Sequence, residues 1–558
     1  MNPVRSSKKI LRNTRKKDET PLESSRRKSR RAKPVFAGLK NDFLTGRADF
    51  VSDKLHQIAP KETSNGVKYQ PTVGLEVHVE LKTASKMFCS CSNDPDEKRP
   101  NVNVCPVCMG HPGTLPVINA EALRKTIKTG LALNCEIPEI TKFDRKNYFY
   151  PDLPKGYQIS QYDQPLCVGG SLLLGNLVSK KIRIRRVHLE EDTGRLLHEK
   201  GHSLVDFNRA GFPLMELVTE PDLDSAKEAR AFAEELQLIL RYLGVSDANM
   251  EKGQMRVEAN VSLAREGKLG TKVEIKNLNS FRAVEKATDY EISRQSKVLT
   301  SGKKVIQETK GWQAQKEVTV SQREKEEAHD YRYFPEPDLP PLRFTSEKID
   351  EIRAELPELP QQRRARFQAE YGLTFKEVAL FAQNKALGDY YEKAASELRN
   401  WAKEIDAQKE VSQEEFFKLA KLCSNYIITD LQGLLKGASV DADFRITPEN
   451  FAEFVILIYR GQISSKTAKL VLEEMFFTGA DPTHIIEEKG LAQITDAAEV
   501  EKIVKEVILQ NPKGVEDFRK GKEASFQFLV GKVMSASKGR ASPEAVHRVL
   551  RATLTKLK

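Results

Sequence analysis

Long apolar runs are missing from this sequence of 558 residues. A membrane-spanning helix needs about 20 consecutive apolar residues, and the best candidate, Phe451 to Tyr459, is far too short. No apolar segment follows a basic start, so a secretory signal peptide is excluded as well. We therefore expect a soluble globular protein that has no membrane segment. Because single cores stop growing near ~250–300 residues, the length predicts two or three domains.

Glycine-rich phosphate loops are also missing. The sequence contains neither Gly-x-x-x-x-Gly-Lys-[Ser/Thr] nor Gly-x-Gly-x-x-Gly. These motifs cradle phosphates with backbone N–H groups at the start of a helix. Any nucleotide must therefore be held in another way, on the surface of a sheet.

Acidic residues are scarce at both ends of the chain. Residues 1–40 hold 14 Lys and Arg against three Asp and Glu, whereas residues 518–558 hold ten bases against two acids. The first ~66 residues have too few apolar side chains for a core, so we expect a disordered basic extension. The basic C-terminal end predicts contact with a polyanion such as RNA, and a solvated helical face is the alternative.

Several segments alternate apolar and polar residues, which predicts strands with one polar face. From Thr72 to Leu81, the residues on the polar side are Gly74, Glu76, His78 and Glu80. Residues 255–263 and 273–276 show the same alternation of apolar and polar residues, and residues 183–192 end in three consecutive acids. Such a face usually meets solvent, but a Glu and a His two residues apart can also converge on a metal ion.

Helical patterns occur between these strands and after them. Residues 225–243 predict an amphipathic helix with Asp224 as its N-cap and Gly244 as its end. From Arg363 onward the pattern is helical, and Ser542 with Pro543 predicts the start of a last helix. Strands and helices do not alternate regularly, so we expect an α+β fold with a mainly antiparallel sheet, followed by an all-helical region and a small helical C-terminal part.

Four of the seven cysteines form two close pairs, Cys89-x-Cys91 and Cys105-x-x-Cys108. Two such knuckles can surround one tetrahedral Zn²⁺ ion. The alternatives are disulfides, or His111 in place of one thiolate. With four protein ligands no open position remains for chemistry, so we expect a structural zinc. The other cysteines, Cys135, Cys167 and Cys423, have apolar neighbours and are expected in the core.

Six long motifs follow one another along the chain: Gly74–Leu81, Asn147–Tyr162, His188–Asp192, Asn208–Pro221, Lys276–Phe281 and Lys325–Pro335. In sequence and in order they resemble the B-subunit family of tRNA-dependent aspartyl/glutamyl amidotransferases, the GatB/GatE family. The resemblance covers the chain from about residue 70 to its C-terminus. The resemblance implies a ligase component that uses ATP and Mg²⁺ to phosphorylate the side-chain carboxylate of Glu-tRNA(Gln) or Asp-tRNA(Asn). Ammonia then displaces the phosphate and gives Gln-tRNA(Gln) or Asn-tRNA(Asn) for translation. The sequence leaves open whether the Gln product, the Asn product or both are made.

The resemblance also implies the metal-site residues and the tRNA-binding role of the C-terminal end, whereas the other contacts and the domain bounds are predicted from the residues themselves and from shifts in composition. The catalytic residues and Mg²⁺ ligands would be Glu76, His78, Glu191 and Glu216. ATP and the tRNA end would meet Tyr148, Lys155, Tyr157, Arg209, Arg256, Glu258, Glu274 and Lys276, although the basic residues could equally form structural ion pairs and the tyrosines could simply pack. The tRNA body would meet Lys532, Lys538, Arg540, Arg548 and Arg551. The expected domains are the extension 1–66, a catalytic cradle domain 67–357 with the zinc loop, a helical domain 358–485 and a tRNA-binding tail 486–558.

The source of ammonia follows from a further absence. We find no Gly/Ser-rich nucleophile segment of the amidase type, so a partner must hydrolyse glutamine. The resemblance implies a heterotrimer in which an amidase, the A subunit, supplies ammonia and a small C subunit is the third member. A cytoplasmic protein of bacterial type is expected, with the mitochondrial matrix as the alternative if the basic extension is a presequence. The rival function is a zinc-stabilised RNA-binding protein without catalysis.

Overall fold

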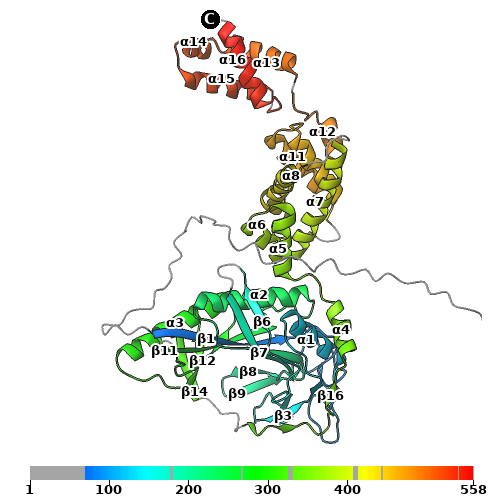
Figure 1. Cartoon of the computed structure of the whole chain (residues 1–558), viewed down its shortest axis with the longest axis vertical. Coiled ribbons are helices and arrows are strands. Elements are labelled where there is room, and N and C mark those ends of the chain that lie inside the picture. Colours follow the sequence, from blue (N-terminus) through cyan, green and yellow to red (C-terminus); the bar gives the residue numbers. More distant parts are fainter. Residues whose placement is uncertain are drawn as a thin grey trace, which may run out of the picture. The chain divides into compact units, whose positions relative to one another are not determined.

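The computed structural model describes residues 69–175, 180–265, 268–324, 331–405, 412–440, 444–494, 496–537 and 539–556. The predicted extension 1–66 lies outside the described residues, and so do Lys538 and residues 325–330 of the last family motif. A strand-rich part comes first in the chain and a run of helices follows it (Figure 1). This order confirms the predicted α+β class.

The largest sheet in the described residues has nine strands. Their order is β14-β13-β12-β11-β1-β10-β7-β5, and β6 also pairs with β7. All neighbours are antiparallel except β12 and β13. The strands are β1 Tyr69–Glu80, β5 Cys167–Val168, β6 Ser171–Leu174, β7 Lys180–Glu191, β10 Pro213–Thr219, β11 Met255–Arg265, β12 Val273–Leu278, β13 Glu308–Gln313 and β14 Val318–Glu324.

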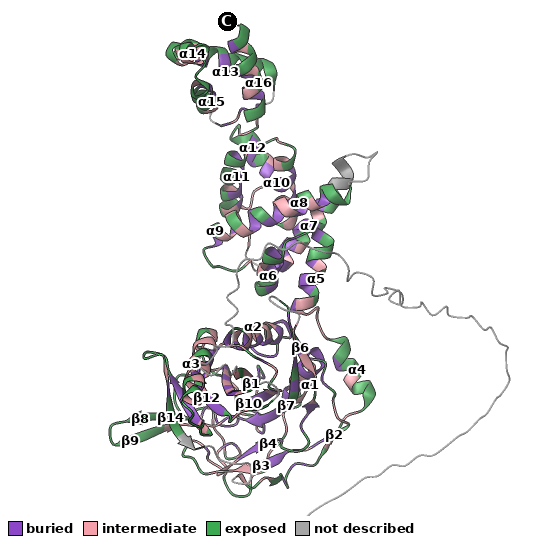
Figure 2. Ribbon diagram, turned by 60° about the vertical axis from the view of Figure 1, so that its left-hand side comes forward, coloured by how far each residue is buried: buried purple, intermediate pink, exposed green. Residues whose placement is uncertain are grey.

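Three small sheets complete the strand-rich part. One joins β3 Asp144–Asn147, β4 Tyr157–Ser160 and β15 Phe334–Pro335, and a second pairs β2 Ile140–Thr141 with β16 Leu342–Arg343. The third is a hairpin of β8 Arg195–Glu199 and β9 His202–Asp206, which is mostly exposed (Figure 2).

The alternation in β1 decides which face of the large sheet is the core. Val73, Leu75, Val77 and Val79 are fully buried, as their spacing of two residues predicts. They belong to one apolar cluster with side chains of α1 Ala120–Ala132, α2 Ala226–Tyr242 and α3 Phe281–Thr300. Because these helices bury the apolar face, the polar side chains of β1 are left to the other face, with β3 and β4 near it (Figure 2).

Helix α2 begins one residue later than the sequence predicts. Its N-cap is Ser225, whose hydroxyl accepts a hydrogen bond from the backbone N–H of Glu228. The predicted N-cap, Asp224, instead pairs with Lys180 at 2.9 Å. Asp224 and Ser225 both suit an N-cap. Because Asp224 pairs with Lys180 of β7, Ser225 caps the helix. Gly244 follows the helix with φ of +65°, as expected for a helix end.

The helices after the sheet enclose two further apolar clusters. Helix α4 Ser346–Ala354 still packs on the first cluster. The second cluster involves α5 Pro360–Tyr371, α6 Phe375–Gln383, α7 Lys385–Ile405, α8 Gln413–Tyr426, the π-helical η2 Ile427–Leu431, α9 Gln432–Leu435, α10 Pro448–Tyr459, α11 Ser465–Thr478 and α12 Pro482–Glu488. The third involves α13 Ala497–Gln510, α14 Pro512–Arg519, α15 Glu523–Ala536 and α16 Pro543–Lys556.

The last helix starts where the sequence predicts. The hydroxyl of Ser542 accepts a hydrogen bond from the backbone N–H of Ala545, and Pro543 is the first residue of α16. In the described part of the chain, no helix combines the length and the apolar content that crossing a membrane requires. The domain boundaries given above remain a prediction.

Candidate functional site

The polar face of the large sheet brings ionisable side chains into one row. His78 of β1 lies opposite Glu216 of β10, and Glu216 lies opposite His188 of β7. Residues directly opposite in antiparallel strands point to the same face, with Cβ atoms about 4.5–5.5 Å apart. The row therefore crosses three strands, and Arg256 of β11, opposite His78, extends it to a fourth.

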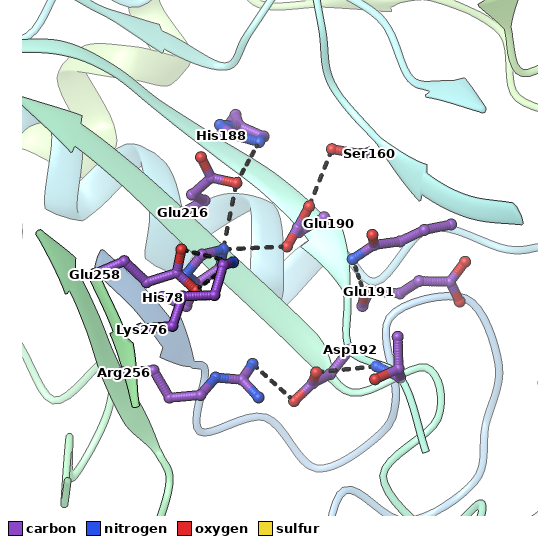
Figure 3. A network of polar contacts seen from close by, with 12 residues as sticks. His78, Ser160, His188, Glu190, Glu191, Asp192, Glu216, Arg256, Glu258 and Lys276 are labelled. Carbon is purple, nitrogen blue, oxygen red and sulfur yellow. Dashed lines mark hydrogen bonds and ion pairs between the residues drawn. The ribbon is translucent and has the colours of Figure 1, made fainter. Parts of the chain in front are cut away.

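A first cluster combines His78 and Glu216 of this row with Glu190, which lies two residues beyond His188 on β7 (Figure 3). His78 Nε2 is 3.4 Å from Glu216 Oε2 and 3.7 Å from Glu190 Oε1. His188 Nε2 is 3.4 Å from the same oxygen of Glu216. One ligand atom from each member of the cluster lies within 4.8 Å of the others. An imidazole nitrogen and two carboxylates at this spacing fit one divalent cation.

Burial and charge shift the pKa values in this cluster. Burial lowers the pKa of His188 to about 4. Burial also lowers the pKa of His78, but the hydrogen bond and charge of Glu216, with the charge of Glu190, outweigh it and raise that pKa to about 9. Burial would raise the pKa of Glu216, but His188 and His78 hold it well below its ordinary value. The raised pKa favours the protonated form of His78 when no cation is bound, and a bound cation would release this proton.

A second cluster lies beside the first, on β1, β11 and β12. One carboxylate oxygen from each of Glu76, Glu258 and Glu274 lies within 4.8 Å of the others. Lys276 Nζ donates to both oxygens of Glu258, at 3.0 and 2.9 Å, and is 3.8 Å from Glu274 Oε1. Asn260 donates to Glu76 at 2.9 Å. Three carboxylate groups at this spacing fit a divalent cation, with the ammonium group of Lys276 beside them.

Glu191 joins neither cluster. Successive residues of a strand point to opposite faces, so Glu190 and Glu191 leave β7 on opposite sides (Figure 3). Glu191 forms an ion pair with Lys155 and accepts a hydrogen bond from the N–H of Ile159 at 2.9 Å. Both ion-pair partners line a cavity of about 200 Å³ beside the cysteines. The structure therefore separates the four predicted catalytic residues: His78 and Glu216 lie in the first cluster, Glu76 lies in the second, and Glu191 lies beside the cavity near the cysteines.

The two arginines predicted to meet phosphate are engaged in ion pairs. Arg209 Nη2 is 2.6 Å and Arg256 Nη2 is 3.1 Å from Asp192 Oδ2. Arg209 also pairs with Glu80. Burial raises the pKa of Glu80 to about 7, although the arginines oppose the shift. Each arginine still exposes about a third of its side chain, 29% and 37%, so both remain accessible from the polar face.

The two predicted tyrosines flank the turn between β3 and β4, and Tyr157 lines the cavity that also holds Lys155 and Glu191. Tyr148 donates to Gln158 at 3.1 Å and meets Tyr331 edge to face, with ring centroids 6.0 Å apart. The guanidinium of Arg145 lies 4.3 Å from the ring centroid of Tyr157. Tyr148 and Tyr157 therefore have protein partners of their own, which supports packing as one of their roles. Both stay partly exposed.

The four clustered cysteines come together as the spacing predicts. Their Sγ atoms lie within 4.8 Å of one another, and those of Cys105 and Cys108 are 3.9 Å apart. Tetrahedral zinc with bonds of about 2.3 Å requires sulfur atoms about 3.8 Å apart. The group therefore fits zinc. All seven cysteines are free thiols, and His111 is exposed and outside the group, so neither alternative is supported.

The basic residues predicted to meet the tRNA body lie in or next to α15 and α16. Lys532 Nζ lies 5.4 Å from the ring centroid of Phe528. Arg540 Nη1 donates to the carbonyl of Gly490 at 3.0 Å, and Arg551 pairs with Glu523 at 2.6 Å. Arg548 is exposed, and Lys538 is outside the described residues. The four described residues keep their charges at or near the surface.

Two family models match most of the chain. The GatB/GatE catalytic domain matches residues 71–350, which hold both carboxylate clusters and the four clustered cysteines, and the GatB domain matches residues 409–554. The chain belongs to the GatB/GatE family. It is 48% identical over 501 residues to the B subunit of the aspartyl/glutamyl-tRNA(Asn/Gln) amidotransferase of Carboxydothermus hydrogenoformans. This match covers 88% of this chain and 100% of the relative. The protein of the same name from Thermotoga maritima is 46% identical over 498 residues, with 88% and 99% covered.

In this GatB/GatE chain, sequence reasoning missed Glu190 of the first cluster and two residues beside that cluster, His188 and Lys146. Glu190 and His188 share the face of β7 that Glu216 meets, and their separation of two residues is the signal that could have found them. Lys146 is the third. Burial lowers its pKa, but the charges of Glu190 and Glu216 raise it overall. No local sequence pattern marks Lys146, because only the packing of β3 beside the sheet brings it near these acids.

Proposed function

We propose that this chain activates the side-chain carboxylate of Glu or Asp carried on tRNA, as one component of an amidotransferase that has several subunits. Its relatives are named as the B subunit of aspartyl/glutamyl-tRNA(Asn/Gln) amidotransferase. The observation that carries the proposal is the first cluster, in which His78, Glu190 and Glu216 converge on one face of the sheet. A carboxylate-lined site of this kind is what phosphoryl transfer with divalent cations requires.

The reaction has two steps. A carboxylate oxygen attacks the γ-phosphorus of ATP, the bond to the bridging oxygen breaks, and ADP leaves. Ammonia then attacks the acyl carbon, the bond from carbon to the phosphate oxygen breaks, and phosphate leaves with the electron pair. The nitrogen loses a proton and becomes the amide. Phosphoryl transfer demands positioning and charge neutralisation rather than covalent catalysis by the protein.

The residues of the two clusters fit Mg²⁺. His78, Glu190 and Glu216 would hold one ion, and Glu76, Glu258 and Glu274 would hold a second. When bound, the ions would neutralise charge on the phosphates. The protein itself supplies Lys276, Arg209 and Arg256 beside the clusters, and their exposed parts can bind phosphate oxygens. In this proposal Glu190 takes the place that the sequence assigned to Glu191.

The surroundings of the clusters support sites for the other substrates. Tyr148 and Tyr157 present partly exposed rings that could stack on adenine or on the terminal base of tRNA. Lys155 lies on the cysteine side of β7, paired with Glu191, and stays a predicted ligand of ATP or of the tRNA end. The basic residues of α15 and α16 would hold the tRNA body. The four cysteines would bind a structural zinc.

The partners follow from the chemistry that the chain lacks. Its sequence has no amidase-type nucleophile segment, so ammonia must come from another protein. We assign this task to an amidase, the A subunit, with a small C subunit completing a heterotrimer. The matched relatives are bacterial proteins, and the cytoplasmic location remains a prediction. The rival function, RNA binding without catalysis, is not favoured, because the matched relatives are named as amidotransferase subunits.

The test uses the complex of this chain with its glutaminase partner. Glu216→Gln keeps the size of the side chain but removes the charge between His78 and His188. We expect loss of ATP hydrolysis that depends on mischarged tRNA, loss of amidated product, and no rescue by added ammonium. Glu234→Gln, on the surface of α2, is the matched control and should retain both activities. Normal ATP hydrolysis by Glu216→Gln would contradict the proposal.

A further inference from the structure

Lys86 is a buried lysine that the proposed reaction does not use. Its side chain is 0% exposed, which places it among the largest fully buried side chains. Its Nζ is 3.8 Å from Cys108 Sγ, 3.3 Å from the carbonyl oxygen of Phe207 and 5.7 Å from the ring centroid of Phe212. Among the described residues, no Asp or Glu forms an ion pair with it. An ammonium group buried without an anion is unfavourable.

The four cysteines supply the missing anion. As thiolates around Zn²⁺ they carry a net charge of −2, and Cys108 is the cysteine that Lys86 touches. We propose that Lys86 is the counter-charge of the four-cysteine site, and that its N–H···S hydrogen bond to Cys108 strengthens zinc binding and makes the thiolates less nucleophilic. This inference rests on the zinc site of the proposed function. It makes Lys86 a positioning residue that acts through the metal ligands.

The backbone holds Lys86 in place from both sides. Its N–H donates to the carbonyl of Cys91 at 3.0 Å, and its own carbonyl accepts from Asn119 Nδ2 at 3.2 Å. Cys108 Sγ accepts a second hydrogen bond, from the N–H of Cys105 at 3.1 Å. The ammonium therefore meets a thiolate that is already oriented. Such outer hydrogen bonds orient metal ligands and tune their donor strength.

The same ammonium ties the cysteine group to the loop that carries Arg209. Phe207, whose carbonyl accepts from Lys86, lies two residues before Arg209 in this loop. Gly211 brings the loop close, with φ of +87°, and a Cβ atom at this position would lie 3.5 Å from Cys108 Cβ and 3.6 Å from Lys86 Cδ. The contact predicts that zinc binding steadies the loop with Arg209 as well as the cysteines.

The test compares Lys86→Met with two other variants of the full-length chain. Met has nearly the same length without the charge, and Lys86→Arg keeps the charge. The matched control is Lys82→Met, because Lys82 is 67% exposed and pairs with Asp247. Zinc affinity is measured by competition with a chromophoric chelator. Co²⁺ replaces zinc for absorption spectra, and iodoacetamide measures how fast the zinc-loaded thiolates react.

We expect Lys86→Met to bind zinc 10- to 100-fold more weakly, which is the range for loss of an outer-shell partner. Its sulfur-to-cobalt charge-transfer band should move to lower energy and its alkylation should be faster, because the thiolates become more electron-rich. Lys86→Arg should recover most of the affinity, and Lys82→Met should match the unmodified chain. If Lys86→Met does not fold, the same measurements are made on Lys86→Gln, which keeps an N–H donor without the charge.

The outcomes separate this inference from the proposed function. An unmodified chain that binds no zinc would overturn the metal assignment and the role of Lys86 together, while ATP hydrolysis would still test the reaction. If the unmodified chain binds zinc, and Lys86→Met matches it in affinity, spectrum and alkylation rate, only the role of Lys86 is overturned. If Lys82→Met bound zinc as weakly as Lys86→Met, the effect would be a general one of charge, and the role of Lys86 would be overturned as well.

Discussion

The neighbours Glu190 and Glu191 offer the sharpest test of the catalytic assignment. They are adjacent in sequence, and their side chains are equally buried, with 4% exposed in each case. Glu190 lies 3.7 Å from His78, whereas Glu191 pairs with Lys155 on the other side of β7. At the Mg²⁺ concentration that saturates the unmodified chain, we expect Glu190→Gln to lose ATP hydrolysis that depends on mischarged tRNA, and Glu191→Gln to preserve it. The same substitution at both positions makes each variant the control for the other.

The magnitude follows from the position of Glu190. Glu190 attracts a unit positive charge at the distance of His78 Nε2, 3.7 Å, by about 4.5 kcal/mol at an effective dielectric constant of ~20, and we take this value as the scale for a cation bound in place of the proton of His78. Burial of Glu190 raises its pKa, so part of this attraction is spent on removing the carboxylate from water. A net loss of about 3–4 kcal/mol corresponds to roughly 10²- to 10³-fold weaker binding of a divalent cation. The Mg²⁺ concentration needed for half-maximal ATP hydrolysis should rise by that factor.

The assay is the initial rate of ADP formation by the assembled complex, measured over a series of Mg²⁺ concentrations. Glu191→Gln should stay within about threefold of the unmodified chain in this assay. It should nevertheless lower the thermal midpoint, because it leaves the buried ammonium of Lys155 unpaired, at a cost of about 3–5 kcal/mol. Loss of ATP hydrolysis in Glu191→Gln together with normal activity in Glu190→Gln would refute the assignment and restore the set predicted from sequence.

Three further predictions concern the zinc site, the C-terminal helices and the second apolar cluster. Cys105→Ala should lose the one zinc ion per chain in metal analysis and weaken ATP hydrolysis without abolishing it; a full zinc content would contradict the site. Deletion of residues 497–558 should weaken tRNA binding and flatten its salt dependence in filter binding, and an unchanged affinity and salt slope would exclude tRNA contact there. Burial raises the pKa of Glu377, but hydrogen bonds from Lys421 and Thr374 lower this pKa overall. The ionised carboxylate therefore stabilises the folded chain above the ordinary pKa near 4.5, and this stabilisation is lost as the pH falls below that value. Glu377→Gln should lower the free energy of unfolding in urea by about 1.5–3 kcal/mol at pH 7 and much less at pH 3; an equal loss at both would contradict the charge effect.

Local patterns in the sequence predicted the elements that face the core correctly. The alternation from Thr72 to Leu81 placed Val73, Leu75, Val77 and Val79 on one side, and all four are fully buried. The spacing of the cysteine pairs likewise predicted their gathering, which the structure confirms. These predictions succeed because a period of two residues, or a short knuckle, is a property of neighbouring residues alone.

The same local reasoning could not choose between neighbouring acids. Three acids in succession end the motif at Asp192, and the resemblance to the family pointed to Glu191. Which acid meets His78 depends on the register between β7, β10 and β1, and strand pairing sets this register over long sequence separations. A shift by one residue would exchange the faces of Glu190 and Glu191.

The sequence by itself determined which residue types were available, which of them alternate along strands, and that four thiols could reach one metal ion. Only the tertiary structure decided their partners. Asp192 lies 17 residues from Arg209 and 64 residues from Arg256, yet it binds both. Lys86 reaches the loop at Phe207 across 121 residues and loses all contact with solvent there. Charge pairing and burial arise from contacts between distant segments, and the energy of a charge depends on those surroundings far more than on its neighbours in sequence.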